Sequence, residues 1–421
     1  MSASILIVGL PWSQDELTLA VEAVRALGGR PVVADTERAL GAIRRPEGCT
    51  YLPVAELSVS AVLAACGDTR PDHVVSITEL TTVLAARVRE AFALPGTSAE
   101  TEAAVTDKFR TRSLLRAAGL TAVDCRETSL RDLPAVLSSV DLPVVVKPVA
   151  FTGSHGVRHI AVPSDADALR DFYDADAAAE SGRDRLIVES VIPGDEISAE
   201  AVCVNGEVRI LGLTDKFNTG VPHYYEVGHV MPSGHTARWL DPVRAYLQDV
   251  VSALKIRTSA LHAELMLHDG RVELVELHTR FGGGSIVQLL AEAYGVRAYD
   301  VYFTALLRGE LPEVPRATGT AGVAFFGGWA GAPFRWHSYD FPCADAVLAL
   351  SLDARAQPKV RQHEGIRLGY WRTGRAVFRA SGADGYARVA ANVAFVRDQF
   401  QRLDPAARPQ DRPSHHEGTH R

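Results

Sequence analysis

Residues 263–285 read AELMLHDGRVELVELHTRFGGGS. Two runs with regularly spaced apolar residues flank His268-Asp-Gly270, and an Asp-Gly pair between such runs is a hairpin signal. Side chains alternate between the two faces of a strand, so the second run places Glu276, His278 and Arg280 on one face. The stretch therefore predicts a β-hairpin that carries a carboxylate, an imidazole and a guanidinium side by side.

The position of Glu264 decides how many carboxylates this face carries. Glu264 lies twelve positions before Glu276, an even separation, so the two share a face only if the loop has an odd number of residues. We expect a three-residue loop, with Glu273 pointing to the other face. Two carboxylates in reach of each other provide the hard oxygen ligands of a site for one or two Mg²⁺ ions. The alternative is a solvent-facing hairpin whose carboxylates only add solubility.

Composition excludes several classes of protein. The 421 residues correspond to about three domains. A formal net charge of −7 argues against nonspecific nucleic-acid binding, which requires a basic surface. No apolar run approaches the roughly 20 residues of a membrane span, and the first residues lack the features of a signal peptide. Cysteines are odd in number and irregularly spaced, which argues against a disulfide framework or a zinc site and for a reducing cytoplasm. They are Cys49, Cys66, Cys125, Cys203 and Cys343.

The first hundred residues alternate strand and helix patterns. Short apolar runs at residues 5–8, 31–35 and 73–77 are typical of buried strands. Ser13 followed by Glu16 predicts a helix that starts with a capping box. This alternation predicts a small open parallel sheet. The Gly-x-Gly-x-x-Gly fingerprint does not follow the first strand, so a dinucleotide site there is not expected.

Two further segments are suited to nucleotide binding. Small residues at 152–156, directly after a strand that ends near Lys147, let backbone N–H groups approach anionic oxygens beside a point charge. In the run from Glu189 to Glu196, a Pro-Gly corner can present backbone groups to an adenine edge, and the second carboxylate can accept ribose hydroxyls. Taken singly, the first segment is a weak signal, since many Gly-Ser loops are only turns, and the second is more typical of a strand with a turn and two surface acids.

Together, the order and spacing of these segments resemble the ATP-grasp superfamily over about residues 1–400. The resemblance implies an α/β and α+β fold in which an open parallel-sheet domain precedes the ATP-grasp domain. The implied boundaries are a pre-grasp αβ domain at 1–100, an ATP-grasp domain at 101–315 with a mobile lid at about 122–200, and a C-terminal α+β unit at 316–403. Residues 404–421, rich in Pro, Arg and His, are expected to be a disordered tail.

The resemblance also assigns functional residues. Arg280 and Lys147 are implied to be catalytic. The implied ATP-binding residues are Lys108, Lys147, Thr152, Gly153, Ser154, Gly156, Glu189, Ile192 and Glu196. The implied ligands of Mg²⁺, or of Mn²⁺, are Glu264, Glu276 and His278. One position departs from the family, which usually has Asn where His278 stands. Because imidazole suits softer ions than Mg²⁺, His278 either tolerates Mn²⁺, acts through water, or is not a ligand.

Residues 280–285 and 228–233 are similar to the superfamily branch that makes amide bonds, notably the L-amino-acid (dipeptide) ligases. The resemblance implies an ATP-dependent carboxylate–amine ligase for small-molecule substrates, which forms an amide through an acyl phosphate and releases ADP and phosphate. It also implies a homodimer. The implied substrate-facing residues are Lys216, Glu226, His229, Arg280 and Gly283.

Two other functions stay open. The first is a carboxylase of the biotin-carboxylase or purine-pathway type, which activates bicarbonate in the same fold. The chain has no Met-Lys-Met biotin site, because its three methionines are Met1, Met231 and Met266. The second is a non-catalytic ATP-binding regulatory module, for which the departure at His278 would be the first sign.

Overall fold

The computed structural model describes residues 2–11, 13–150, 156–165, 167, 185–221, 224–311, 313–329, 332–333, 341–352 and 371–403. The chain divides into two compact units. The first unit is formed by Met1–Ala122, Pro193–Asp215 and Met231–Thr318, and the second by Val123–Ile192, Lys216–Val230 and Gly319–Arg421.

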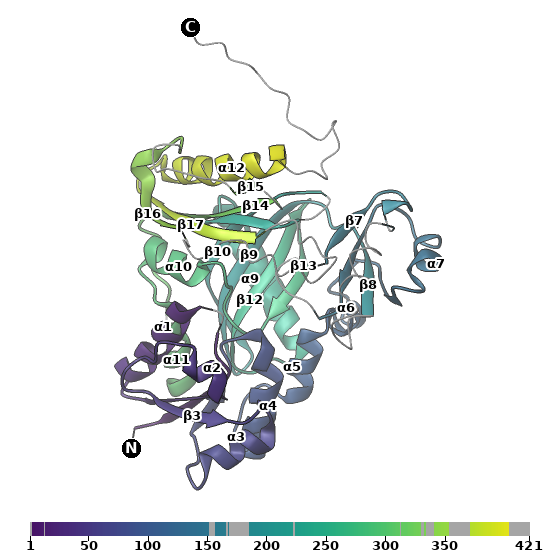
Figure 1. Cartoon of the computed structure of the whole chain (residues 1–421). Helices are drawn as coiled ribbons and strands as arrows, with labels where there is room; N and C mark the ends of the chain where they lie inside the picture. Colours follow the sequence, from purple (N-terminus) through teal and green to yellow (C-terminus); the bar gives the residue numbers. More distant parts are fainter. Residues whose placement is uncertain are drawn as a thin grey trace. The chain divides into compact units, whose positions relative to one another are not determined.

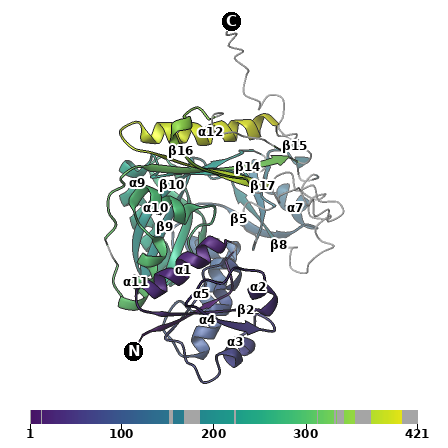
Figure 2. The same ribbon diagram turned by 60° about the vertical axis from the view of Figure 1, so that its left-hand side comes forward.

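The first unit begins with a four-stranded parallel sheet in the order β3-β2-β1-β4, as expected from the alternating pattern. Strand β1 is buried along its whole length, which is typical of a parallel sheet covered on both faces. Figure 2 shows the sheet with its helices in purple and dark blue. The elements are β1 (Ser4–Val8), α1 (Gln14–Ala26), β2 (Arg30–Thr36), α2 (Glu37–Gly41), β3 (Thr50–Val54), α3 (Val59–Cys66), β4 (His73–Val75), η1 (Glu79–Thr81) and α4 (Thr82–Ala91).

The start of α1 differs from the expected capping box. Ser13 occupies the N-cap position, but its side chain makes no capping hydrogen bond. Glu16 is partly buried instead, and burial raises the pKa of its carboxyl to about 7 although Arg280 acts in the opposite direction. The position of the helix start was therefore predicted, but its mechanism was not.

An antiparallel sheet in the order β13-β12-β9-β10 forms the centre of the first unit. One face packs on helix α9 in an apolar core that includes Trp239, Leu247, Leu265 and Leu277 (Figure 1). Strand β10 passes into the second unit after Asp215. The elements are α5 (Ala99–Thr106), α6 (Lys108–Ala117), β9 (Asp195–Val204), β10 (Glu207–Asn218), α9 (Thr236–Leu254), β12 (Ser259–His268), β13 (Arg271–His278), α10 (Ile286–Tyr294) and α11 (Ala298–Arg308).

The hairpin between β12 and β13 has a two-residue turn, so the expected three-residue loop is wrong. Asp269 and Gly270 have positive φ angles of 45° and 76°, as a type I′ turn requires. Glu264 nevertheless lies directly opposite Glu276, because a β-bulge at Val275 adds one residue to β13. An extra residue in the strand reverses the parity just as an odd loop would.

Because of the same bulge, the expectation that Glu273 points to the opposite face is wrong. Glu273 pairs with Met266, which lies two residues from Glu264 on β12. Because residues two apart on a strand share a face, Glu273 lies on the face of Glu276 and not on the opposite one.

The second unit contains two sheets with separate apolar cores. One sheet has the order β5-β8-β6-β7, and the other joins β11, β14, β17 and β16. Helix α12 packs along β14 and β17, as both views show (Figures 1 and 2). The elements are β5 (Cys125–Ser129), α7 (Leu133–Leu137), β6 (Val144–Pro148), β7 (Arg158–Ile160), β8 (Arg185–Ser190), β11 (Glu226–Met231), β14 (Thr320–Trp329), β15 (Ala332–Pro333), η3 (Ala344–Ala346), β16 (Val347–Leu352), β17 (Trp371–Ala380) and α12 (Gly385–Leu403).

Within the described ranges, none of the helices combines the length and the hydropathy of a bilayer span.

Candidate active site

The antiparallel sheet of the first unit carries two neighbouring rows of polar side chains on one face. In the first row, Ser198, Glu264 and Glu276 lie directly opposite one another on β9, β12 and β13. In the second row, Glu200, His262 and His278 are aligned in the same way. The two predicted metal carboxylates are therefore direct cross-strand neighbours.

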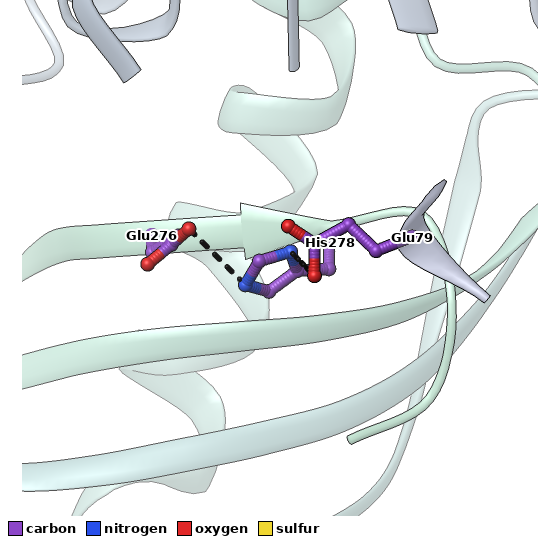
Figure 3. A group of neighbouring side chains, drawn as sticks. All are labelled: Glu79, Glu276 and His278. Carbon is purple, nitrogen blue, oxygen red and sulfur yellow. Dashed lines mark ion pairs between the residues drawn. The ribbon is translucent and has the colours of Figure 1, made fainter. Parts of the chain in front are cut away.

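Glu79 brings a further carboxylate to this face from the turn η1. Its Oε2 lies 3.3 Å from His278 Nδ1 and 2.7 Å from Arg280 Nη2. On the other side of the ring, His278 Nε2 lies 3.4 Å from Glu276 Oε1 (Figure 3). One ligand atom from each of Glu79, Glu276 and His278 can be chosen so that all three lie within 4.8 Å of one another. This donor set can hold a metal ion.

Of the two histidines in the second row, His262 is positively charged at pH 7 and His278 is neutral. Burial opposes the charged form of His262, but the charge and hydrogen bond of Glu200, with those of Glu264, raise the pKa of this imidazole to about 9. Burial, reinforced by Arg280 and by charged His262, holds the pKa of His278 well below its usual range. His278 is therefore neutral at pH 7, the state in which an imidazole nitrogen can bind a metal.

Lys108 stands at the first turn of α6. Asp107 caps this helix by accepting a hydrogen bond from the N–H of Arg110. The Lys108 ammonium lies 2.7 Å from Glu276 Oε1, and Arg112, one turn further along α6, lies 3.0 Å from Glu273 Oε1. An ammonium is therefore already in place beside the predicted metal carboxylate.

In the second unit, Lys147 on β6 and Glu189 on β8 form a buried ion pair. Their Nζ and Oε2 atoms are 2.7 Å apart, and their side chains are 7% and 4% exposed. Val145 lies opposite Glu189 in the register, which brings the two strands together at this point. The predicted phosphate-binding lysine thus contacts the predicted adenine-hinge carboxylate directly.

The other predicted nucleotide residues are placed in part. Thr152, Gly153 and Ser154 lie outside the described residues. Gly156 is buried with a φ of 72°, a left-handed conformation that suits glycine. Ile192 is half-buried after β8, and half-buried Glu196 pairs with Met266 at the start of β9.

Three predicted substrate residues meet in the second unit, on β10 and β11. Lys216 Nζ lies 3.3 Å from Glu226 Oε1, and His229 Nε2 lies 3.3 Å from Glu226 Oε2. His229 is fully buried, yet neither ring nitrogen makes a hydrogen bond to any described residue. The 3.3 Å contact is an ion-pair distance without hydrogen-bond geometry. Gly283, in the first unit, is exposed and has no heavy atom within 4 Å of where a Cβ would lie.

Sequence reasoning missed Glu79, Glu200 and His262. Glu79 follows a short strand far from the hairpin, and no local pattern marks it. Glu200 did have a signal, because it is the carboxylate within a strand of otherwise small and apolar residues, ISAEAVCV at 197–204. A charge in such a strand must be paired.

Part of the sequence is similar to known proteins. The ATP-grasp domain family matches residues 140–288. The chain is 24% identical over 238 residues to the L-arginine-specific L-amino acid ligase of Bacillus subtilis, a match that covers 54% of this chain and 56% of that one. The chain spans about half the length of the curated relatives it matches first.

Solved structures show the same arrangement over nearly the whole chain. An L-amino acid ligase from Bacillus licheniformis has a TM-score of 0.71 at 21% identity, with 94% of this chain and 96% of that one covered. An N5-carboxyaminoimidazole synthase from Aspergillus clavatus has a TM-score of 0.68 at 15% identity, with 94% and 99% covered. The chain therefore contains an ATP-grasp domain and has the ATP-grasp fold.

Proposed function

We propose that this chain is an ATP-dependent carboxylate–amine ligase that joins amino acids through an amide bond and releases ADP and phosphate. The observation that supports it most is the cross-strand pair of Glu264 and Glu276, with the Lys108 ammonium beside it. Paired carboxylates next to a lysine are suited to a divalent cation and a polyphosphate. Similarity to L-amino acid ligases supports the choice of an amide-forming reaction.

The donor set fits a divalent cation. Glu79 and Glu276 supply hard oxygens, with Glu264 directly opposite Glu276 on β12. Neutral His278 supplies a nitrogen that suits Mn²⁺ better than Mg²⁺. We therefore propose that Mn²⁺ serves as well as Mg²⁺ or better. A divalent cation bound there would neutralise phosphate charge and align ATP for phosphoryl transfer.

The positions assigned to ATP follow from the resemblance to the ATP-grasp superfamily, and the chemistry of their side chains suits these roles. Lys108 and Lys147 supply ammonium groups for the phosphates, and the segment from Thr152 to Gly156 supplies backbone N–H groups. Glu189 and Ile192 are assigned to the adenine, and Glu196 to the ribose. The positive charges of Lys108 and Lys147 offset the negative charge that spreads over the transferred phosphoryl group.

The reaction proceeds in two displacements. A carboxylate oxygen of the first substrate attacks the γ-phosphorus of ATP, which forms an acyl phosphate and releases ADP. The amine nitrogen of the second substrate then attacks the acyl carbon, the C–O bond to phosphate breaks, and the nitrogen loses a proton. Arg280 is assigned to the oxygens that carry charge in both steps. A lid at about 122–200 would exclude water from the acyl phosphate.

Substrate recognition is assigned to charged groups. Lys216 and His229 suit a carboxylate or phosphate, and Glu226 suits an amino group. Gly283 leaves open space beside Arg280 for a substrate. We also propose a homodimer. The odd number and irregular spacing of the five cysteines support a reducing cytoplasm as its compartment.

A matched pair of variants on β13 tests the proposal. Glu276→Ala should abolish carboxylate-dependent ADP release, whereas Glu273→Ala removes an acid of equal exposure (17%) that pairs with Arg112 and should retain it. Near wild-type ADP and amide formation by Glu276→Ala would reject the metal assignment. ADP release that requires bicarbonate would indicate a carboxylase, and tight ATP binding without any release would indicate a regulatory module.

A further inference from the structure

Glu200 is a fully buried carboxylate at the centre of the sheet in the first unit. It lies on β9 and is 0% exposed, and its neighbours Ala199 and Ala201 are equally buried. Removing a carboxylate from water is costly unless hydrogen bonds and a counter-charge replace the lost hydration. The contacts of Glu200 therefore indicate what this buried side chain does.

Both carboxylate oxygens of Glu200 are engaged, and each contacts a different part of the candidate site. Oε1 lies 2.5 Å from His262 Nδ1 and 3.4 Å from the Ser198 hydroxyl. Oε2 accepts a hydrogen bond of 2.8 Å from the backbone N–H of Gly282. One side chain thus holds an imidazole on β12 and the first residue of the glycine-rich loop that follows Arg280.

His262 carries the effect of Glu200 to the metal carboxylates. Its second nitrogen, Nε2, lies 3.5 Å from Glu264 Oε1. Its ring stacks on His278, with centroids 5.8 Å apart and planes inclined by 20°. The orientation of His262, fixed by Glu200, therefore defines where Glu264 and His278 can stand.

The contact to Gly282 leaves no space for adjustment. A Cβ at this position would lie 2.6 Å from His262 Nδ1, well inside any normal contact. The backbone after Arg280 and the imidazole are therefore packed against each other as well as bonded to the same carboxylate.

We propose that Glu200 is a positioning residue of the phosphoryl-transfer site, acting through His262 on Glu264 and through Gly282 on the loop after Arg280. The inference rests on the proposed function, because it takes Glu264 and Glu276 as the residues that hold the cation of the metal–ATP complex. Outer partners of metal ligands act in this way, and their removal commonly weakens metal binding by roughly 10–100-fold.

The test measures binding of Mn²⁺·ATP to the full chain without amino acids, through the increase in the water-proton relaxation rate. We expect Glu200→Gln to raise the dissociation constant by roughly 10–100-fold, and to raise the KM for Mn²⁺ in ADP release more than it lowers kcat. The control is Cys203→Ala, a fully buried position on the same strand that faces away from the row. The control should lower the thermal midpoint and leave Mn²⁺·ATP binding unchanged.

Wild-type affinity in Glu200→Gln, or the same loss in Cys203→Ala, would overturn the inference and leave the proposed function intact. Absence of Mn²⁺·ATP binding by the wild type would overturn both. If Glu200→Gln does not fold, Glu200→Asp tests the inference instead, because it keeps a carboxylate but moves it away from His262 and Gly282 by one methylene group. We expect Glu200→Asp to have a native circular dichroism spectrum and weakened Mn²⁺·ATP binding, and unchanged binding would reject the role of Glu200.

Discussion

Replacing Gly282 by alanine would test how tightly the two polar rows are packed. The added Cβ would lie 2.6 Å from His262 Nδ1 and 2.9 Å from Ile286 Cδ1. To restore a normal separation, the imidazole would have to withdraw by roughly 1 Å. It cannot do so freely, because it is held 2.5 Å from Glu200 and is stacked on His278.

The size of the effect follows from these contacts. Overpacking a tight interior costs about 1–3 kcal/mol, and weakening the hydrogen bond from Gly282 N–H to the Glu200 carboxylate adds about 1 kcal/mol or more. A total of roughly 3 kcal/mol corresponds to a fall in the thermal midpoint of roughly 5–10 °C for a unit of this size. Because the disturbed groups adjoin Glu264, ADP release should fall with stability.

The neighbouring residue supplies the control. A Cβ at Gly283 would meet no heavy atom within 4 Å, so Gly283→Ala should change the unfolding free energy by less than about 0.5 kcal/mol. Differential scanning calorimetry of both variants measures the difference. Equal midpoints for the two variants would refute the packing argument.

Three further predictions concern charge. Lys147→Met leaves the buried carboxylate of Glu189 without its ammonium, so a urea titration should show that the free energy of unfolding falls by about 3–5 kcal/mol. The double variant with Glu189→Leu should recover most of this loss, and a single variant as stable as the wild type would contradict the pairing. Burial raises the pKa of Glu102 from 4.5 to about 7, so the folded state binds this proton more tightly than the unfolded state does. The stability that this group contributes is therefore fully present below pH 4.5 and is lost as the pH rises to about 7. Between pH 5 and 8 the wild type should therefore lose up to about 3 kcal/mol more than Glu102→Gln, and parallel pH profiles of the thermal midpoint would reject this. His278→Asn offers a hard amide oxygen, so the ratio of Mg²⁺- to Mn²⁺-supported ADP release should rise severalfold, whereas an unchanged ratio would show that His278 is not a ligand.

The hairpin shows how a correct residue pairing can be predicted together with a wrong loop length. Glu264 and Glu276 were expected to face each other, and they do. An Asp-Gly pair indicates a two-residue turn, whereas the even separation of Glu264 and Glu276 requires an odd number of loop residues if both strands are regular. A bulge at Val275 satisfies both, and a bulge has no sequence signal as strong as that of a turn. The pairing of Glu264 with Glu276 was therefore predictable from the sequence, but the β-bulge that produces it was not.

Residues far from the hairpin in sequence were harder to find. Glu79 lies in η1, after the last strand of the open parallel sheet, and no local pattern marks it, so only the folded structure shows its contacts with His278 and Arg280. Glu200 could have been found, because a carboxylate in a buried strand requires a partner. The identity of that partner, His262, depends on strand register, which residue patterns alone did not define.

The most direct measurement incubates the chain with ATP and Mg²⁺ or Mn²⁺, first with single amino acids and then with pairs. ADP, phosphate and the mass of the product are measured in the same samples. We expect that, with a suitable pair, ADP, phosphate and a dipeptide form in equal amounts, and that omission of either amino acid prevents formation of the dipeptide. ADP release that depends on bicarbonate, or no ADP release with any amino acid, would contradict it.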